Sequence, residues 1–183
     1  YGDQLLDETA AHHDSFSHDL CSEWEHSAAQ FMQLGTRVCY LRTGIVLGEG
    51  EGALARMVPP FRMGLGGRIG SGNQWMPWIH IKDEIDLIFH CMKCSDLSGS
   101  INASSPNPVT NSQFSQTLGK VLSRPVIFPM PAFVAKLLFG EMAEELLLTG
   151  QRVHPRKLLE SGFEFSYPEL APALEQILVK SSS

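Results

Sequence analysis

The feature that most constrains the fold is a near-continuous apolar run at residues 36–48, TRVCYLRTGIVLG, which leads directly into a glycine-rich loop. Strands buried on both faces, as in parallel sheets, read as continuous apolar runs rather than as alternating ones. Gly35 precedes the run and ends the preceding helical pattern. The sequence therefore predicts a buried strand of an α/β sheet at residues 36–48.

The loop after this strand, GEGEGA, formally fits the dinucleotide-binding pattern G-x-G-x-x-G/A. A phosphate-binding loop of that kind opens a long helix and is followed by an acidic residue about 20 positions later. Here the following helix runs into Pro59-Pro60, and the next acidic residue after Glu51 is Asp83. Glu49 and Glu51 would also repel a pyrophosphate. We therefore exclude GEGEGA as the phosphate cradle.

The remaining pattern alternates helices with short strands and then becomes helix-rich. An amphipathic helix is predicted at 16–33, and Pro59 and Pro60 are expected to interrupt a short helix beginning at residue 53. Asp83 is expected to cap or open a helix at 83–94, and Asn111 or Ser112 to cap the next one. Strands are predicted within 67–81 and at 98–104, and further helices at 111–122, 131–139, 141–149, 155–161 and 168–180. This order indicates an α/β protein with a second, mainly helical lobe.

Composition excludes several classes of partner. The net charge is −6 with no basic stripe, so we expect no nucleic-acid partner and no anionic-membrane partner. No apolar run reaches the ~20 residues of a membrane span. The most hydrophobic segment, 131–150, is interrupted by charged side chains, and no signal peptide is visible. The four cysteines are too few for a disulfide scaffold, which favours a reducing, cytoplasmic location.

Two of those cysteines, Cys91 and Cys94, form a C-x-x-C in the sequence HCMKC beside His90. This spacing occurs in metal sites and redox pairs, but no second C-x-x-C or H-x-x-H completes a tetrahedral set. The surrounding residues have helical spacing, and a free cysteine usually behaves as a small buried hydrophobe. We therefore expect no metal site and interpret both cysteines as structural.

Several motifs, in order, carry a resemblance to a known family. TRVCYLRTGIVLG, PPFRMGLGGRIGSGNQWMPWIHIKD, GSINASSPNPVTNSQFSQTLGKVLSRP and the tail FGEMAEELLLTGQRVHPRKLLESGFEFSYPEL span essentially the whole chain. Together they resemble the C-terminal part of an extended short-chain dehydrogenase/reductase, in the branch of nucleoside-diphosphate-sugar epimerase-like proteins. The initial YG resembles the end of the family's S-x-x-x-x-Y-Y-G stretch. This implies that about a hundred residues of the nucleotide-binding half, including its glycine fingerprint, lie upstream.

The resemblance also implies a domain division and a cofactor site. Residues 1–48 would be a remnant of the nucleotide-binding domain, and 49–183 the substrate-lobe region, with 82–104 packing back on the nucleotide-binding sheet. The fold would be the C-terminal part of a Rossmann-like doubly wound parallel sheet plus a smaller, mainly helical substrate lobe. The cofactor of the full-length protein would be NADP or NAD. Its nicotinamide would contact the backbone at Thr43, Gly44, Ile45 and Val46; a buried strand end with a closely packed glycine is the alternative interpretation.

The catalytic pair of this family is missing from the chain. Extended reductases and epimerases use Tyr-x-x-x-Lys on the helix before this strand, where the tyrosine transfers a proton and the lysine lowers its pKa. No lysine precedes Lys82, and none of the three tyrosines has a lysine four residues later. His18, Asp19 and Glu23 are candidate substitutes, although a solvated helix face is the favoured interpretation of these residues. The catalytic residues therefore remain unknown.

Candidate substrate contacts follow in the glycine-rich segment. WIHIKD resembles the R-x-x-[FV]-H-V-x-D motif of the superfamily, in which the histidine packs at the lobe interface. Arg62, Arg68, Trp78 and His80 are the predicted substrate-binding residues, with Trp75 beside them. Arginine suits bidentate binding of phosphate or carboxylate, although surface arginines over an aromatic patch would look the same.

Two functions remain open. The first is an epimerase-like NAD(P)-binding protein that acts as an oxidoreductase or epimerase on a sugar nucleotide or a small carbonyl compound. The alternative is a non-catalytic NADP-binding or regulatory module on the same fold, which has lost Tyr-x-x-x-Lys. The 183 residues alone are expected to bind no dinucleotide, and open strand edges make self-association an expectation.

Overall fold

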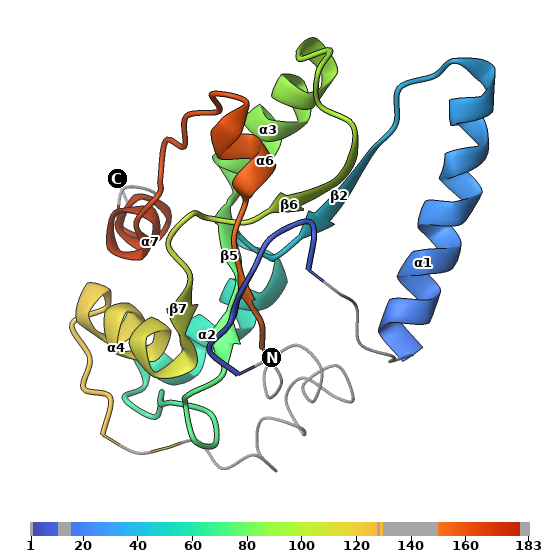
Figure 1. Ribbon diagram of the computed structural model, residues 1–183. Coiled ribbons are helices and arrows are strands. Elements are labelled where there is room, and N and C mark those ends of the chain that lie inside the picture. The colour runs from blue at the N-terminus through green and yellow to red at the C-terminus, as the bar shows by residue number, and fades with distance from the viewer. Residues whose placement is uncertain (1, 11–15, 128, 130–149, 180–183) are drawn as a thin grey trace.

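The computed structural model describes residues 2–10, 16–127, 129 and 150–179. Helices alternate with short strands along the chain (Figure 1). The strands are β1 Leu5–Leu6, β2 Cys39–Thr43, β3 Ile45–Leu47, β4 Trp75–Met76, β5 Trp78–His80, β6 Gly99–Ala103, β7 Val109–Thr110 and β8 Arg152–Val153. The helices are α1 Phe16–Ala29, the 3-10 helix η1 Gln30–Leu34, α2 Gly52–Arg62, α3 Ile81–Lys93, α4 Asn111–Val121, α6 Arg156–Glu160 and α7 Leu170–Leu178.

The predicted strand at 36–48 forms β2 and β3, which are two halves of one extended segment joined at Gly44. β2 pairs in parallel with β6, and β3 pairs in parallel with β5. The neighbour changes at the joint, because Gly44 N–H donates to Ala103 O at 3.0 Å and Ile45 N–H donates to Pro77 O at 2.8 Å. Two further pairs, parallel β1–β8 and antiparallel β4–β7, complete the pairing of the described strands. The prediction of an α/β protein with parallel strands is confirmed.

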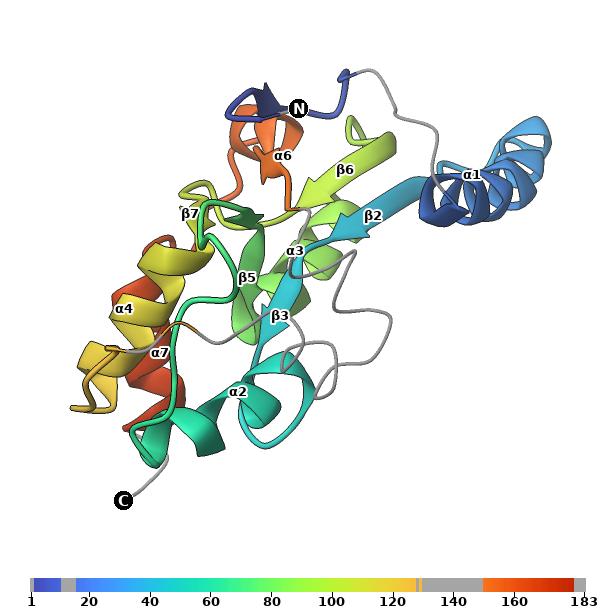
Figure 2. The ribbon, with the colours of Figure 1, turned by 90° about the horizontal axis from the view of Figure 1, so that it is seen from below.

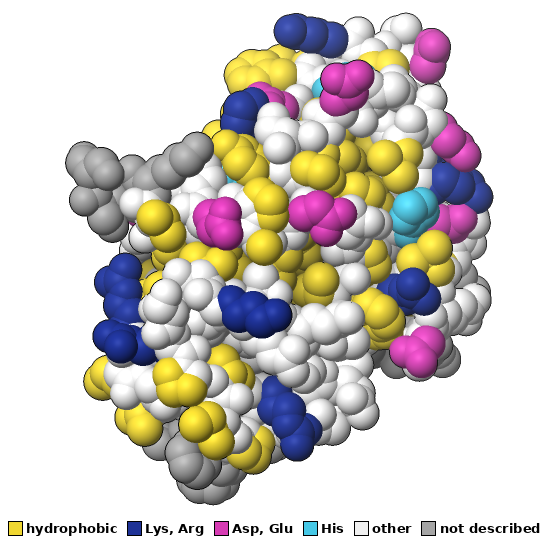
Figure 3. Space-filling model, turned by 90° about the vertical axis from the view of Figure 1, so that its left-hand side faces the viewer, with side chains coloured by type: hydrophobic (Ala, Val, Ile, Leu, Met, Phe, Trp, Pro, Cys, Tyr) yellow, Lys and Arg dark blue, Asp and Glu magenta, His cyan; other side chains and the backbone are white. Residues whose placement is uncertain are grey.

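Two hydrophobic clusters pack against the paired strands, one around β6 and one around β3 and β5. One lies around β6, where Leu87 and Cys91 of α3 pack with Ile101, Leu158 and Phe163. The larger cluster joins α2, α4 and α7 around β3 and β5, and the two described helices α4 and α7 lie side by side in Figures 1 and 2. Figure 3 views the face on that side of the molecule, where hydrophobic side chains gather between scattered acidic and basic ones.

Helix α1 stands away from the other described elements in both ribbon views (Figures 1 and 2). Its polar links to the sheet include a bidentate pair, in which Arg42 Nε and Nη2 donate to the two carboxylate oxygens of Glu25 at 2.8 and 2.9 Å, and Ser100 Oγ of β6 donates to the same carboxylate at 3.5 Å. Trp24 remains 66% exposed, and Phe31 and Leu34 in η1 are also exposed. The helical pattern is therefore confirmed, but within the described residues its apolar side chains are largely solvent-facing.

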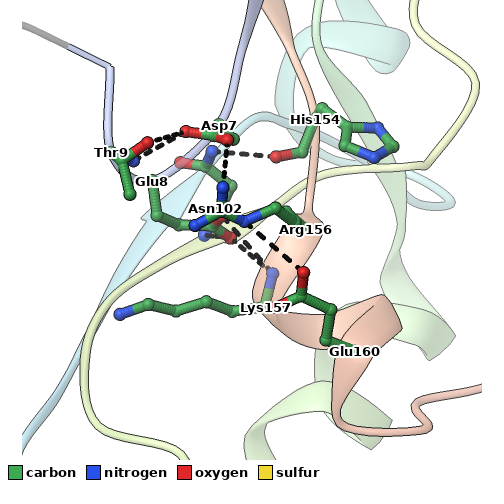
Figure 4. A network of polar contacts seen from close by, with 8 residues as sticks. All are labelled: Asp7, Glu8, Thr9, Asn102, His154, Arg156, Lys157 and Glu160. Carbon is green, nitrogen blue, oxygen red and sulfur yellow. Dashed lines mark hydrogen bonds and ion pairs between the residues drawn. The ribbon is translucent and has the colours of Figure 1, made fainter.

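The N-terminal segment is fastened to the C-terminal part by a polar network (Figure 4). Glu8 accepts from the backbone N–H of Asn102 at 3.1 Å and, at 3.4 Å, from that of Lys157 at the start of α6. Arg156 pairs with Asp7 at 2.7 Å, and Asn102 Nδ2 donates to His154 O at 3.0 Å. These contacts fix β1 beside β8 and close one side of β6.

Two local predictions are wrong. Pro59 and Pro60 lie inside α2 and do not interrupt it, because they occupy its last turns, where only two backbone bonds are lost and φ near −65° suits a helix. The cap of α4 is Thr110, one residue before Asn111. Thr110 Oγ1 accepts from Gln113 N–H, and the Gln113 side chain accepts from Thr110 N–H, so the two form a capping box.

The start of α3 also differs from the prediction. His80 is its N-cap, and its Nδ1 accepts from Lys82 N–H at 3.0 Å, whereas Asp83 lies inside the first turn. The strand at 98–104 and the helices near 155–161 and 168–180 are confirmed as β6, α6 and α7. The helices expected at 131–139 and 141–149 lie outside the described residues.

Candidate functional site

At Gly44, which follows the carboxyl end of β2, the backbone packs closely against the backbone of Pro77 and Trp78. A Cβ added to Gly44 would lie 2.8 Å from Pro77 O and 3.0 Å from Pro77 C, so only glycine fits without displacement. Thr43 at this end is exposed, whereas Gly44, Ile45 and Val46 are half-buried. In open α/β sheets, ligands bind at the carboxyl ends of the strands. Thr43–Val46 therefore have the position expected of a wall beside a ligand, and their contact with nicotinamide stays a prediction.

A buried carboxyl lies next to this wall. Glu84, in the first turn of α3, accepts from Thr43 Oγ1 at 3.1 Å, while its Oε2 is buried without a hydrogen-bond partner. Burial raises the pKa of Glu84, and the hydrogen bond from Thr43 opposes part of that rise. Since ionisation is disfavoured in the folded state, Glu84 costs stability as the pH rises from its ordinary pKa through the raised one. In the sequence, Glu84 reads only as an acidic residue near a helix start.

The neighbouring carboxylate, Asp83, has a structural role. It is fully buried and accepts from the backbone N–H groups of Ser166 at 2.7 Å and Tyr167 at 2.9 Å. His80 packs on Tyr167 with 4.0 Å between ring centroids, and its Nε2 lies 2.9 Å from Gln176 Oε1. Because Nδ1 accepts from a backbone N–H, Nε2 is the protonated nitrogen of a neutral ring. His80 and Asp83 thus join β5 and α3 to the segment before α7.

The predicted substrate residues do not surround a single hollow within the described residues. Arg68 lines a hollow of about 150 Å³ with Ser112 and Gln116 of α4, and its guanidinium donates to Gly70 O and Ser71 O. His80 lines a different hollow, of about 380 Å³, between the start of α3 and α7. Trp78 is fully buried in the larger hydrophobic cluster, with no acceptor for Nε1. Arg62 is exposed at the end of α2. Their contact with substrate stays a prediction.

The helix that would carry the catalytic pair presents Asp19 and Glu23 to solvent. Among the described residues, no group of three His, Cys, Asp or Glu side chains is arranged to hold a metal ion. None of the described helices combines the length and apolarity that crossing a bilayer requires.

The cysteines differ in exposure, and this predicts their reactivity. Burial, helped by nearby Cys39, raises the pKa of the Cys91 thiol to about 11, whereas Cys21 is exposed. At pH 8 only about one Cys91 in a thousand would be the reactive thiolate. We expect a chromogenic disulfide reagent at pH 8 to modify Cys21 rapidly and Cys91 only after denaturation. Mass spectrometry of the modified peptides checks this; equal rates for Cys21 and Cys91 in the folded protein would contradict it.

Known proteins match most of this chain in sequence. Residues 130–177 match a family described as a domain of unknown function (DUF1731). Over 163 residues the chain is 42% identical to the human epimerase family protein SDR39U1, covering 89% of this chain and 55% of the relative. It is 37% identical to the epimerase family protein ML0860 of Mycobacterium leprae, covering 98% of this chain and 59% of that protein. The chain thus spans somewhat more than half the length of these relatives.

Solved structures agree with the sequence relatives. The crystal structure of human SDR39U1 (isoform 2) with NADPH superposes with a TM-score of 0.88 at 39% identity, covering 95% of this chain and 59% of that one. A nucleoside-diphosphate sugar epimerase from Corynebacterium glutamicum superposes with a TM-score of 0.80 at 31% identity, covering 97% and 34% of the two chains. These matches confirm the resemblance drawn from the motifs and the Rossmann-like fold class. Over most of its own length the chain is therefore similar to part of the epimerase family proteins represented by SDR39U1.

Proposed function

We propose that the full-length protein binds NADP(H) or NAD(H), with the nicotinamide against Thr43, Gly44, Ile45 and Val46. The proposal rests on the joint at Gly44, where a strand end without a side chain lies at the carboxyl edge of parallel strands. The solved relative with NADPH supports the cofactor class. The GEGEGA loop fits the pattern of a phosphate cradle but carries Glu49 and Glu51 and lacks the long helix and the acidic residue that should follow, so the proposal assigns the pyrophosphate to residues outside these 183.

The proposed activity is that of an oxidoreductase or epimerase on a sugar nucleotide or a small carbonyl compound. A reduced nicotinamide supplies a hydride to a carbonyl carbon, and the carbonyl oxygen then takes a proton from an acid of the protein. Asp19 and Glu23 are ionisable groups on the helix where the family places its tyrosine, and both reach solvent. The second candidate is a non-catalytic NADP-binding module, which the absence of Tyr-x-x-x-Lys favours.

Calorimetry with NADPH tests the cofactor assignment. We expect the protein extended upstream of Tyr1 to its start codon to bind NADPH, and the 183-residue chain alone to show no binding. No heat from the extended protein would overturn the cofactor proposal. Clear binding by the 183 residues alone would overturn the assignment of the phosphate cradle to other residues.

A substrate screen separates the two candidate functions. Sugar nucleotides and small carbonyl compounds are mixed with the extended protein and NADPH, and the loss of NADPH absorbance is followed. Oxidation that depends on substrate and is abolished by Asp19→Asn with Glu23→Gln supports an enzyme that uses a substitute acid. Binding of NADPH without turnover of any compound supports the non-catalytic module.

A further inference from the structure

Three segments distant in sequence meet at the side chain of Arg152. Its Cζ lies 4.7 Å from the centre of the Trp75 ring, which places the guanidinium over the ring face. Arg152 Nη1 donates to Asp3 O at 3.3 Å, and Trp75 Nε1 donates to Asp3 Oδ1 at 3.1 Å. Asp3, which precedes β1, and Trp75 of β4 therefore hold Arg152 of β8 in one place through a backbone carbonyl and a ring contact.

Arg152 forms no ion pair in the described part of the chain; the carboxylate of neighbouring Asp3 is bonded to the Trp75 indole instead. Two other half-buried arginines form ion pairs: Arg42 with Glu25, and Arg156 with both Asp7 and Glu160. None of the ion pairs among the described residues includes Arg152, and its Nε is buried without an acceptor. A buried donor that lacks a partner costs about 1–3 kcal/mol, more when the group is charged. An arginine that is positioned but unpaired is suited to receiving an anion from outside.

We propose that Arg152 and Trp75 form a binding subsite for the oxyanion of a small molecule, a phosphate or a carboxylate. Nε is buried and Nη1 already donates to Asp3 O, so the remaining N–H groups of Nη1 and Nη2 are the ones that would meet two oxygens of such an anion. Asp3 keeps the ring in place through the indole N–H, so the indole and guanidinium planes remain stacked when the anion is absent.

The position of the subsite connects it with the proposed reaction and, in this respect, rests on the proposed function. Trp75 precedes by two residues Pro77, whose carbonyl accepts from Ile45 N–H at the joint beside Gly44. Two residues of extended chain span about 7 Å. The short path from Trp75 to Pro77 thus links the subsite to the Thr43–Val46 wall along the chain, and the proposed subsite would select substrates with an acidic group.

Nuclear magnetic resonance of the tryptophan indole N–H groups tests the subsite without cofactor or turnover. The protein extended to its start codon is labelled at tryptophan, and Trp75 is assigned from the Trp75→Phe variant. We expect inorganic pyrophosphate, and more weakly phosphate and acetate, to shift the Trp75 signal in a saturable way. Arg152→Gln should weaken pyrophosphate binding at least tenfold, and Arg152→Lys should weaken it less, because the charge remains without the planar fork.

Arg124→Gln is the matched control, since Arg124 is exposed after α4 and lies outside the subsite. It should leave the pyrophosphate titration unchanged. If the spectrum shows that Arg152→Gln is unfolded, the pyrophosphate affinity of Arg152→Lys is compared with that of the parent protein instead. Equal shifts in the Arg152 and Arg124 variants, or no saturable shift in the parent, would overturn the subsite. The pyrophosphate titration contains no NADPH, so it is independent of the cofactor proposal. If the protein binds NADPH but shows no saturable shift of the Trp75 signal, the subsite is refuted and the proposed function is not. If the protein does not bind NADPH, the titration can still be interpreted.

Discussion

Gly44→Ala is expected to lower the free energy of unfolding by about 1–3 kcal/mol, since the added methyl group must push apart two packed backbones. The Cβ would lie 2.8 Å from Pro77 O, a backbone atom that cannot rotate away. The displacement would also reach the hydrogen bond from Ile45 N–H to Pro77 O and the bond from Gly44 N–H to Ala103 O. Chemical denaturation of both proteins measures the difference.

Gly48→Ala is the matched control for this substitution. Gly48 follows β3 in the same segment, and a Cβ there would make an ordinary contact with Ile81 at 3.5 Å. Its expected effect is a change of less than about 1 kcal/mol, of either sign. The extended protein carrying Gly44→Ala should also lose NADPH affinity if the joint faces the nicotinamide. Equal stabilities of the Gly44 and Gly48 variants would contradict the close packing at the joint.

Asp83→Ala is expected to lower the free energy of unfolding by about 3–5 kcal/mol, because it removes two hydrogen bonds to a charged acceptor. The carboxylate is fully buried and receives the N–H groups of Ser166 and Tyr167, and both would lose this acceptor. Tyr167 packs on His80, so the loss should also loosen the contact between β5 and the segment before α7. Thermal unfolding gives the stability change, and amide hydrogen exchange at Ser166 and Tyr167 reports the loosening.

Two variants make the result specific. Asp83→Asn keeps one acceptor oxygen and should recover part of the loss. Asp86→Ala, on the same helix, removes a surface ion pair with Lys82 and should cost less than about 1 kcal/mol. A similar loss from Asp83→Ala and Asp86→Ala would show that Asp83 does not fasten the segment.

The strand of the candidate site was predictable because its evidence is local. A continuous apolar run ending in TGIVLG reads as a parallel strand whatever surrounds it, and the structure confirms it as β2 and β3. Its division at Gly44 was not predictable, since the change of partner depends on where Pro77 and Ala103 arrive from elsewhere in the chain. The starts of two helices differ from the prediction by a residue or more. From the sequence, several neighbouring polar residues are equally suitable N-caps, and only the structure shows that His80 and Thr110 make the capping hydrogen bonds.

Residues whose role depends on distant contacts gave no sequence signal. Glu84 reads as an ordinary acidic residue in a first helical turn, and only the approach of α3 to Thr43 buries it. Arg152 and Trp75 lie 77 positions apart in the sequence, and they meet because β1 pairs with β8 while Asp3 holds the indole. The absence of Tyr-x-x-x-Lys, by contrast, was certain from the sequence and leaves the acid of the reaction to experiment.

The contact between Glu8 and Asn102 makes the two edges of the β2–β6 pair differ in their ability to accept another strand. Ala103 O receives a bond from Gly44 N–H on the β2 side, so the N–H of the preceding Asn102 points to the opposite side, where Glu8 accepts it. A carboxylate on that edge takes up the donor that an incoming strand would need and repels its carbonyl oxygens. Within the described residues, the edge of β2 away from β6 carries no strand. An added strand would therefore find an open edge at β2, whereas at Asn102 of β6 the donor it needs is already taken by Glu8.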